Sequence, residues 1–233
     1  MGMKAVILAA GEGKRMQPLT LTRPKPLVEV LGKPILAHIL EALPKEIDEV
    51  VLVVGYKREM IEGYFREKYA GRKLSYVVQE RVEGTLKALS LARPHLSGRF
   101  LLMNADDIHG TEALEEALRY PLSLIVAPHK EPKLFGVVKV GEDGNLEEII
   151  EKPEVPPTNL VSTGAMVLDE RIFGYDVSAS PSGEYYLPDA LQELAKDAPV
   201  AVVVQDLWLP LGRPEDIAPA EERLRNIEGK GAS

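Results

Sequence analysis

The chain begins with an apolar run, Ala5-Val6-Ile7-Leu8-Ala9-Ala10, which breaks into Gly11-Glu12-Gly13-Lys14-Arg15. The apolar run predicts a buried β-strand that ends at the glycines. Gly11 and Gly13 allow backbone N–H groups to approach an anion without an intervening Cβ. Lys14, Arg15 and, further along the chain, Lys25 supply positive charge for phosphate oxygens. The stretch therefore predicts a strand that leads into a phosphate-binding loop.

The spacing of the glycines excludes two common kinds of phosphate loop. A P-loop has four residues between its glycines and then Gly-Lys-Ser/Thr, and this loop has neither. A dinucleotide-binding fingerprint needs a third glycine where Met16 stands. The alternative interpretation is a flexible surface turn with solvated charges. Prolines at positions 18, 24 and 26 argue against it, because they stiffen the segment and reduce the entropy that it loses on closing over a ligand.

The chain alternates strand-like and helix-like patterns, which is typical of an α/β protein. Continuous apolar runs such as Val50-Val51-Leu52-Val53-Val54 indicate parallel strands that are covered on both faces. We expect helices near residues 35–43, 58–69 and 85–91, and strands at 49–54, 74–78 and 100–103. The predicted fold class is α/β, with a doubly wound, mostly parallel, Rossmann-like sheet that binds its ligand at the carboxyl ends of the strands.

The second half of the chain changes to short strands separated by turn signals such as Glu142-Asp143-Gly144-Asn145. We expect these strands at 123–127, 136–140, 146–150, 165–168 and 200–204. No stretch reads as a linker between two domains. We therefore expect one domain over residues 1–228, followed by a flexible tail at 229–233.

The composition excludes several classes of protein. The 233 residues include no cysteine, are 45% hydrophobic and carry a net charge of −8. The lack of cysteine removes disulfides and thiolate nucleophiles, and the net charge argues against a nucleic-acid surface. No apolar run reaches the roughly 18 residues of a membrane helix, and the start lacks a signal-peptide layout. We expect a cytoplasmic protein that binds small anions, with no nucleic-acid or membrane partner, either as a monomer or as a homo-oligomer.

Three stretches resemble the opening motif of the sugar-phosphate nucleotidylyltransferases, the family of the glucose-1-phosphate thymidylyl- and uridylyltransferases and of the mannose-1-phosphate guanylyltransferases. They are residues 8–20, 23–28 and 32–35, which read Leu-Ala-Ala-Gly-x-Gly-x-Arg-x-x-Pro-Leu-Thr, Arg-Pro-Lys-Pro-Leu-Val and Gly-Lys-Pro-Ile. The resemblance implies a GT-A-like nucleotidyltransferase fold and the transfer of a nucleoside monophosphate from a nucleoside triphosphate to a sugar 1-phosphate. It also implies a nucleotide-binding part over about 1–120 and a sugar-phosphate-binding part, rich in β-structure, over about 121–228.

The second chemical element is Asn104-Ala105-Asp106-Asp107, directly after the strand expected at 100–103. A carboxylate at the end of a strand and opposite a phosphate loop is a suitable oxygen ligand for Mg²⁺. We expect Asp106 to be this metal ligand and Mg²⁺ to be the cofactor. The alternative role for either aspartate is to cap the next helix, and Asp107 is the better candidate for the cap.

The third element is Gln79, followed by Gly84 and Thr85 at the start of a helix, and it resembles the base-binding segment of the family. An amide offers both a donor and an acceptor, which suits the N–H and carbonyl groups of uracil or thymine. Guanine presents two donors, which a carboxylate matches better. We expect Gln79 to favour a pyrimidine, although the alternative is a solvated strand end. Leu86 replaces the alanine that is usual in the family and adds bulk close to the expected nucleotide.

The resemblance places the sugar phosphate against four residues. It implies that Glu151 binds the sugar hydroxyls, that Lys152 binds the phosphate, and that Gly136 and Gly164 give backbone contacts. On its own, a Glu-Lys pair is more often a solvated strand end. Ser162 replaces a frequent asparagine, which leaves the choice of sugar open.

One position departs from the family pattern. Members commonly show Trp-x-Asp-x-Gly-x-Pro near the C-terminus, and its aspartate is a second metal ligand. Here Pro210 stands in that place, between Trp208 and Gly212. Three explanations remain: Asp106 suffices together with the phosphates and water, Asp107 or Asp206 substitutes, or much of the activity is lost.

The reaction that we expect is direct in-line attack of the sugar phosphate on the α-phosphorus, with pyrophosphate as the leaving group. The catalytic residues are then Arg15, Lys25, Asp106 and Lys152. The substrate-binding residues are Leu8, Ala9, Ala10, Gly11, Gly13, Lys14, Gln79, Gly84, Thr85, Asn104, Gly136, Glu151 and Gly164. Two alternatives are a non-catalytic nucleotide-sugar sensor and a cytidylyltransferase for a non-sugar phosphate.

No histidine falls in a motif: His38 and His95 suit packing or surface positions, and His109 and His129 suit loops.

Overall fold

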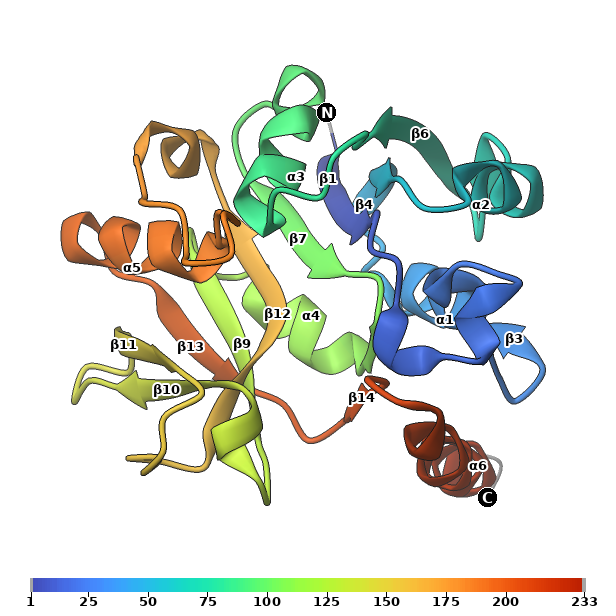
Figure 1. Cartoon of the computed structure of the whole chain (residues 1–233). Helices are drawn as coiled ribbons and strands as arrows, with labels where there is room; N and C mark the ends of the chain where they lie inside the picture. Colours follow the sequence, from blue (N-terminus) through green and yellow to red (C-terminus); the bar gives the residue numbers. More distant parts are fainter. Residues whose placement is uncertain (1, 232–233) are drawn as a thin grey trace.

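The apolar run at the start of the chain forms β1 (Met3–Ala9), which lies in the middle of a 10-stranded sheet (Figure 1). The computed structural model describes residues 2–231. β1 pairs in parallel with β4 (Ile47–Val54) on one side and with β7 (Phe100–Asn104) on the other, so that Ile7 is level with Leu52 and Met103. The predicted parallel sheet is confirmed, and the three strands end at the same edge.

The sheet order is β11-β10-β12-β7-β1-β4-β6-β5, and β9 joins β12 to β13. The strands of the first half are mostly parallel, whereas β12 runs antiparallel to β7, β9 and β10. The remaining strands are β2 (Glu29–Val30), β3 (Lys33–Pro34), β5 (Lys68–Tyr69), β6 (Arg72–Val78), β8 (Asp107–His109), β9 (Ser123–Pro128), β10 (Gly136–Val140), β11 (Leu146–Glu151), β12 (Leu160–Leu168), β13 (Ala201–Val204) and β14 (Trp208–Pro210). The expected change from a parallel to a mixed, β-rich half is therefore present.

Helices cover both faces of the sheet, as expected for a doubly wound fold. They are α1 (Ile35–Ala42), α2 (Arg58–Phe65), α3 (Thr85–Ala92), α4 (Thr111–Ala117), α5 (Leu187–Asp197) and α6 (Ile217–Gly231). Along β1, Ala5 and Ile7 pack in one core with α1, α2 and α4, whereas Val6 packs in a second core with α3 and α5 (Figure 1). A strand that is buried on both faces has no polar alternation, which explains its continuous apolar sequence.

Two predicted elements have different boundaries in the structure. The helix expected at 58–69 ends at Phe65, because Arg66 adopts a positive φ of 54°, which a helix cannot continue through, and residues 68–69 form β5. The strand expected at 165–168 begins earlier, at Leu160. Both differences concern boundaries, which are set by local backbone conformation and by pairing with neighbouring strands.

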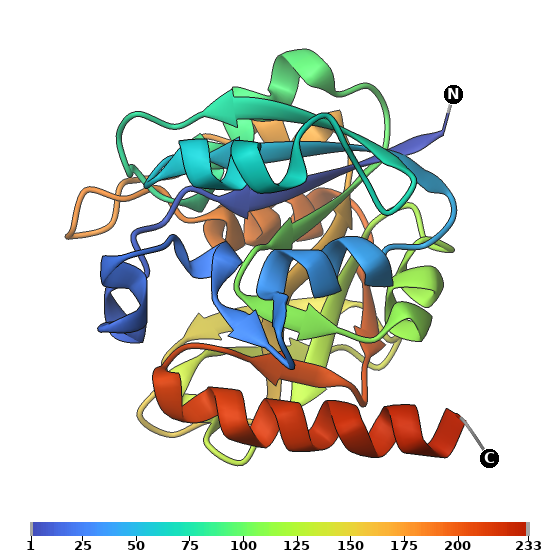
Figure 2. The ribbon, with the colours of Figure 1, turned by 90° about the vertical axis from the view of Figure 1, so that its right-hand side faces the viewer.

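The C-terminal helix α6 extends along one side of the fold (Figure 2). Within it, Glu221 accepts a hydrogen bond from the backbone N–H of Leu31 (2.9 Å). Residues 229–231 of the expected tail belong to this helix, and residues 232–233 lie outside the described residues. None of the helices within residues 2–231 combines the length and the hydropathy needed to cross a membrane.

We expect Ile39→Ala to lower the free energy of unfolding by about 2–5 kcal/mol, because the side chain in α1 is fully buried and its loss leaves a cavity. Ile39→Val removes one methylene group and is the matched control, with an expected loss of about 0.5–1.5 kcal/mol. Urea titration monitored by circular dichroism measures both values. Equal losses for the two variants would contradict the packing of α1 against the sheet.

Candidate active site

The phosphate loop follows β1 and folds back on Lys25. Gly13 adopts a left-handed conformation with φ 65°, and a Cβ at this position would lie 3.0 Å from the Cβ of Lys25 and 3.1 Å from the Cγ2 of Thr20. Glycine is therefore required here both for its backbone conformation and for space. Thr20 donates a hydrogen bond to the carbonyl oxygen of Gly13 (2.9 Å). These contacts fix the backbone of the loop and the stem of Lys25 relative to each other.

Two residues that the sequence analysis missed hold the outer part of this loop. Tyr56 donates its hydroxyl hydrogen to the carbonyl oxygen of Thr20 (3.1 Å), and the ammonium of Lys57 donates to the carbonyl oxygen of Leu21 (2.8 Å). Both follow β4, the strand next to β1. The sequence signal that could have identified Tyr56 and Lys57 is their position just after a strand that is parallel to β1. Neighbouring parallel strands end at the same edge of a sheet, so residues that follow them lie close together.

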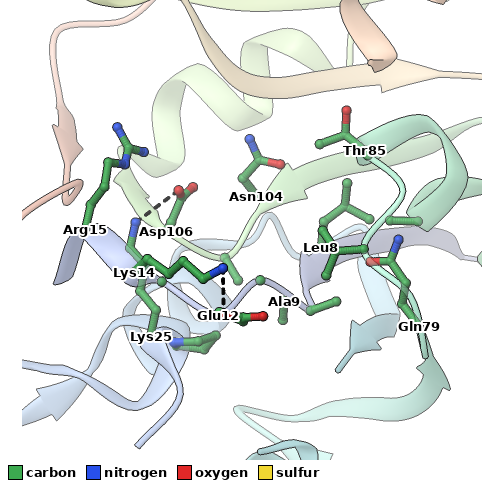
Figure 3. A pocket seen from close by; sticks show the side chains of 18 of the residues that line it. Leu8, Ala9, Glu12, Lys14, Arg15, Lys25, Gln79, Thr85, Asn104 and Asp106 are labelled. Carbon is green, nitrogen blue, oxygen red and sulfur yellow. Dashed lines mark hydrogen bonds and ion pairs between the residues drawn. The ribbon is translucent and has the colours of Figure 1, made fainter. Parts of the chain in front are cut away.

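A cavity of about 600 Å³ opens at the carboxyl ends of β1, β6 and β7 (Figure 3). Its walls bring together most of the predicted site residues, namely Leu8, Ala9, Ala10, Gly11, Gly13, Lys14, Arg15, Lys25, Gln79, Gly84, Thr85, Asn104 and Asp106. They also include residues that the sequence analysis did not select, among them Glu12, Val82, Glu184, Tyr186 and Gly212. The segment around Glu184 lies about 100 residues beyond the expected base-binding segment, so only the fold brings it here.

The cationic groups of the cavity differ in their partners. The Nζ of Lys25 lies 3.0 Å from the Oδ2 of Asp106, and the side chain of Lys25 is only 10% exposed. The Nζ of Lys14 lies 3.2 Å from the Oε2 of Glu12, and both of these side chains are well exposed (Figure 3). Within residues 2–231, Arg15 has no carboxylate partner.

The part of the cavity around Gln79, where the base is expected, is largely closed off from solvent. Gln79 is 7% exposed and lines the cavity, so the alternative of a solvated strand end is wrong. At Gly84, which has φ 97°, a Cβ would run into the backbone of Tyr185. The Oγ1 of Thr85 accepts a hydrogen bond from the N–H of Leu187 (2.9 Å). The segment before α5 thus packs directly against the start of α3.

The expectation that Leu86 adds bulk close to the nucleotide is wrong. Its side chain packs in the core with α5, and its N–H donates to the carbonyl oxygen of Tyr185 (3.0 Å). Leu86 does not line the cavity. The added bulk therefore fills the core between α3 and α5 and not the space expected for a nucleotide.

Of the residues expected at the sugar phosphate, Gly136, Glu151 and Gly164 lie on β10, β11 and β12, and Lys152 directly follows β11. Gly136 pairs with Glu151 across β10 and β11, and the Nζ of Lys152 lies 2.7 Å from the Oε1 of Glu151. Both of these side chains are exposed. Gly164 has φ 74° and packs directly against the side chain of Asn104, which lines the cavity. Gly164 therefore connects this group to the cavity, whereas Gly136, Glu151 and Lys152 stand outside its walls.

Asp107 does not cap the next helix, contrary to expectation. It lies in β8, and α4 begins later, with Gly110 at its N-cap position. Its carboxylate accepts hydrogen bonds from the Nε1 of Trp208 (3.0 Å) and the N–H of Leu211 (3.4 Å), and Pro210 is its register partner across β8 and β14. Burial, together with repulsion from Asp106, raises the pKa of Asp107 to about 8.

The cavity wall thus contains Asp106 but neither Asp107, Asp206 nor Pro210. Among the described residues, no group of three or more histidine, aspartate or glutamate side chains is arranged to hold a metal ion.

His109 is a buried strand residue and not a loop residue. It lies in β8 with 2% exposure, and its Nδ1 is 3.0 Å from the Nε2 of Gln205. Burial lowers the pKa of His109 to about 4. His129 does lie in a loop, and the Nε2 of His38 lies 2.9 Å from the carbonyl oxygen of Val30, as expected for a packing residue.

A mostly parallel sheet with a glycine loop, two lysines and a carboxylate at the carboxyl ends of its strands is typical of α/β proteins that bind nucleotides. Residues 4–226 match the family model described as nucleotidyl transferase. The chain therefore belongs to the nucleotidyl transferase family, and the predicted resemblance is confirmed.

Three known proteins show the extent of the similarity. The bifunctional protein GlmU of Methanocaldococcus jannaschii is 38% identical over 98% of this chain and 57% of its own length. The UTP–glucose-1-phosphate uridylyltransferase AglF of Haloferax volcanii is 36% identical over 96% of this chain and 97% of its own. The crystal structure of a UDP-glucose pyrophosphorylase in complex with UDP-glucose superposes with a TM-score of 0.83 at 22% identity, over 97% of this chain and 100% of the other. The chain spans about half the length of the GlmU relatives that it matches.

We expect His109 to make the protein sensitive to acid. In the unfolded chain its pKa is about 6.5, and in the folded chain it is about 4. Between these values the unfolded chain binds a proton that the folded chain does not, so stability falls as pH falls. His109→Gln should reduce the difference in unfolding free energy between pH 7 and pH 4.5 by about 2–3 kcal/mol. Urea titrations at both pH values measure this difference, and an unchanged difference would show that His109 is hydrated.

Proposed function

We propose that the protein transfers a nucleoside monophosphate from a nucleoside triphosphate to a sugar 1-phosphate and releases pyrophosphate. The observation that carries the proposal is the cavity, which joins a glycine loop, Lys25 and Asp106 at one end to the amide of Gln79 at the other. AglF, whose name states this type of reaction, matches this chain over nearly the whole length of AglF. The proposal therefore rests on a site and on a relative of the same size.

The reaction needs no protein nucleophile. An oxygen of the sugar phosphate attacks the α-phosphorus, a P–O bond forms, and the bond to the bridging oxygen of pyrophosphate breaks. The attacking phosphate is already ionised near pH 7, so the protein has to align the groups and neutralise their charge. We assign this role to Arg15 and Lys25 in the cavity and to Lys152 beside it.

Mg²⁺ fits the donor set of the cavity. Asp106 offers a carboxylate on the cavity wall, and Mg²⁺ commonly takes one or two protein carboxylates, with water and substrate phosphates as its other ligands. When bound, the ion would neutralise charge on the phosphate groups. Pro210 offers no ligand oxygen, and Asp107, its register partner, is engaged by Trp208 and Leu211. Asp106 is therefore our candidate for the protein carboxylate that holds the ion.

A second candidate function is that of a nucleotide-sugar sensor without turnover. It is favoured by Pro210, which stands where the family commonly has a metal-binding aspartate. Such a protein would bind the same ligands in the same cavity but release no pyrophosphate.

A pyrophosphate-release assay separates these candidates. The purified protein is tested with UTP, dTTP, CTP, GTP and ATP against a set of sugar 1-phosphates and phosphocholine, with and without Mg²⁺. We expect release with UTP or dTTP and a sugar 1-phosphate in the presence of Mg²⁺. Ligand binding by calorimetry without release in any combination would favour the sensor, and release with CTP and phosphocholine would contradict a sugar substrate.

We expect Lys25→Ala to lower kcat by about 100-fold, with a smaller change in nucleotide affinity, because the ammonium meets charge that develops during the transfer. Lys139→Ala is the matched control, since this lysine also pairs with a carboxylate, that of Glu148 (2.7 Å), but lies outside the cavity. Steady-state kinetics and calorimetry measure the two effects. An unchanged kcat removes Lys25 from the catalytic group.

We expect Gln79→Glu to lower the preference for UTP or dTTP over GTP by about tenfold, because a carboxylate cannot donate to a base carbonyl and leaves that group unpaired. The ratio of kcat/KM values for the two nucleotides measures the preference and cancels general losses of activity. A ratio equal to that of the wild type would show that Gln79 does not contact the base.

A further inference from the structure

Tyr56 contacts both ends of the phosphate loop from the strand next to β1. Its backbone N–H donates to the carbonyl oxygen of Ala10 (3.2 Å), and its hydroxyl donates to the carbonyl oxygen of Thr20 (3.1 Å). We propose that Tyr56 is a positioning residue for the triphosphate: it lies outside the cavity wall and holds the loop between these two anchors in the conformation that binds phosphate. The inference rests on the proposed function in that the ligand of the loop is a triphosphate.

The first anchor is a close approach of two backbones. The pairing of β1 with β4, in which Ala9 is level with Val54, brings the start of the loop to the residues that follow β4. A Cβ at Gly55 would lie only 2.8 Å from the carbonyl oxygen of Ala10. The start of the loop is therefore fixed by the sheet, and this anchor does not depend on a side chain.

The second anchor depends on the side chain of Tyr56 and reaches the loop through Thr20. Thr20 is 2% exposed, and its hydroxyl donates to the carbonyl oxygen of Gly13 (2.9 Å), which also accepts the N–H of Met16 (2.9 Å). The Cγ2 of Thr20 packs so closely on Gly13 that a Cβ there would lie 3.1 Å from it. The hydroxyl of Tyr56 thus fixes Thr20, and Thr20 fixes the turn at Gly13.

This turn determines where the donors of the loop lie. Residues 11–15 all line the cavity, and their backbone N–H groups have no acceptor within residues 2–231. The side chains of Lys14 and Arg15 extend from the same stretch (Figure 3). A loop that is not held would have to be ordered by its ligand, and the lost chain entropy would weaken phosphate binding. The hydroxyl of Tyr56 therefore contributes to affinity without contact with the phosphates.

The test is the binding of inorganic tripolyphosphate and of UTP, measured by isothermal titration calorimetry in buffer that contains Mg²⁺. We expect Tyr56→Phe to raise both Kd values by about fivefold, which corresponds to the loss of one hydrogen bond of ordinary strength. Tyr76→Phe is the matched control, because the hydroxyl of Tyr76 also donates to a backbone carbonyl oxygen, that of Arg66, and neither residue lines the cavity. The control should change both Kd values by less than about twofold.

A double-mutant cycle separates positioning through Thr20 from a general loss of stability. Thr20→Val removes the hydroxyl that bonds Gly13, so in this background Tyr56→Phe should raise the Kd of tripolyphosphate by less than about twofold. Thr20→Ser keeps the hydroxyl, and in this background the full effect of Tyr56→Phe should remain. Urea titration measures the stability of each variant. Equal effects in the two backgrounds, or a loss of stability with unchanged Kd values, would overturn the proposal.

Steady-state kinetics gives a second readout that a merely structural role would not produce. Tyr56→Phe should raise the KM for UTP by about fivefold and leave the KM for the sugar 1-phosphate within about twofold, because the loop holds only the triphosphate. A similar rise in both KM values would contradict positioning of the loop.

Tripolyphosphate keeps this test separate from the proposed function, because it carries no base and transfers no nucleotide. Weaker binding of tripolyphosphate by Tyr56→Phe, together with no pyrophosphate release from any nucleotide, supports the role of Tyr56 and contradicts the transfer reaction. Normal turnover with unchanged Kd values contradicts the role of Tyr56 alone. A wild-type protein that binds neither ligand contradicts both.

Discussion

The parallel pairing of β1 with β4 and β7 is the constraint on which the site depends. Parallel strands end at one edge of a sheet, so three connections that are distant in sequence meet there. The first carries the glycine loop, the second carries Tyr56 and Lys57, and the third carries Asp106. Because the central residues of these strands are buried, their register is fixed by the core, and the positions of the phosphate-binding groups are fixed with it.

The electrostatics of the cavity follow from unequal burial. The net charge of the protein is −8, yet the loop concentrates cations at one place. Lys25 is nearly excluded from water and is paired, whereas Lys14 is exposed, and Arg15 has no carboxylate partner within residues 2–231. Lys14 and Lys25 therefore differ in how readily they can bind an anionic ligand. Sequence alone does not reveal this difference, because it depends on how deeply each side chain is buried.

The sequence was sufficient to predict the longer strands of the sheet, the helices α1, α2 and α3 and the loop at the end of β1, because these depend on local apolar periodicity and on glycine spacing. It gave no prediction of α4, α5 or α6. It was insufficient for Asp107, His109 and Leu86. β8 pairs with β14, about 100 residues away, and this pairing accompanies the burial of His109 and the partial burial of Asp107. Leu86 is covered by the segment around Tyr185, again about 100 residues distant. Such long-range contacts leave no periodic signal in a single sequence.

The register of β8 and β14 also places positions 107 and 210 of the chain directly opposite each other. Asp107 faces Pro210, and its carboxylate occupies the donors of Trp208 and Leu211. An aspartate at position 210 would stand opposite Asp107, whose pKa is already raised to about 8 by burial and by repulsion from Asp106, so a further carboxylate there would add to this repulsion. We therefore expect the energetic effects of substitutions at positions 107 and 210 to be non-additive, because each side chain is part of the other's surroundings.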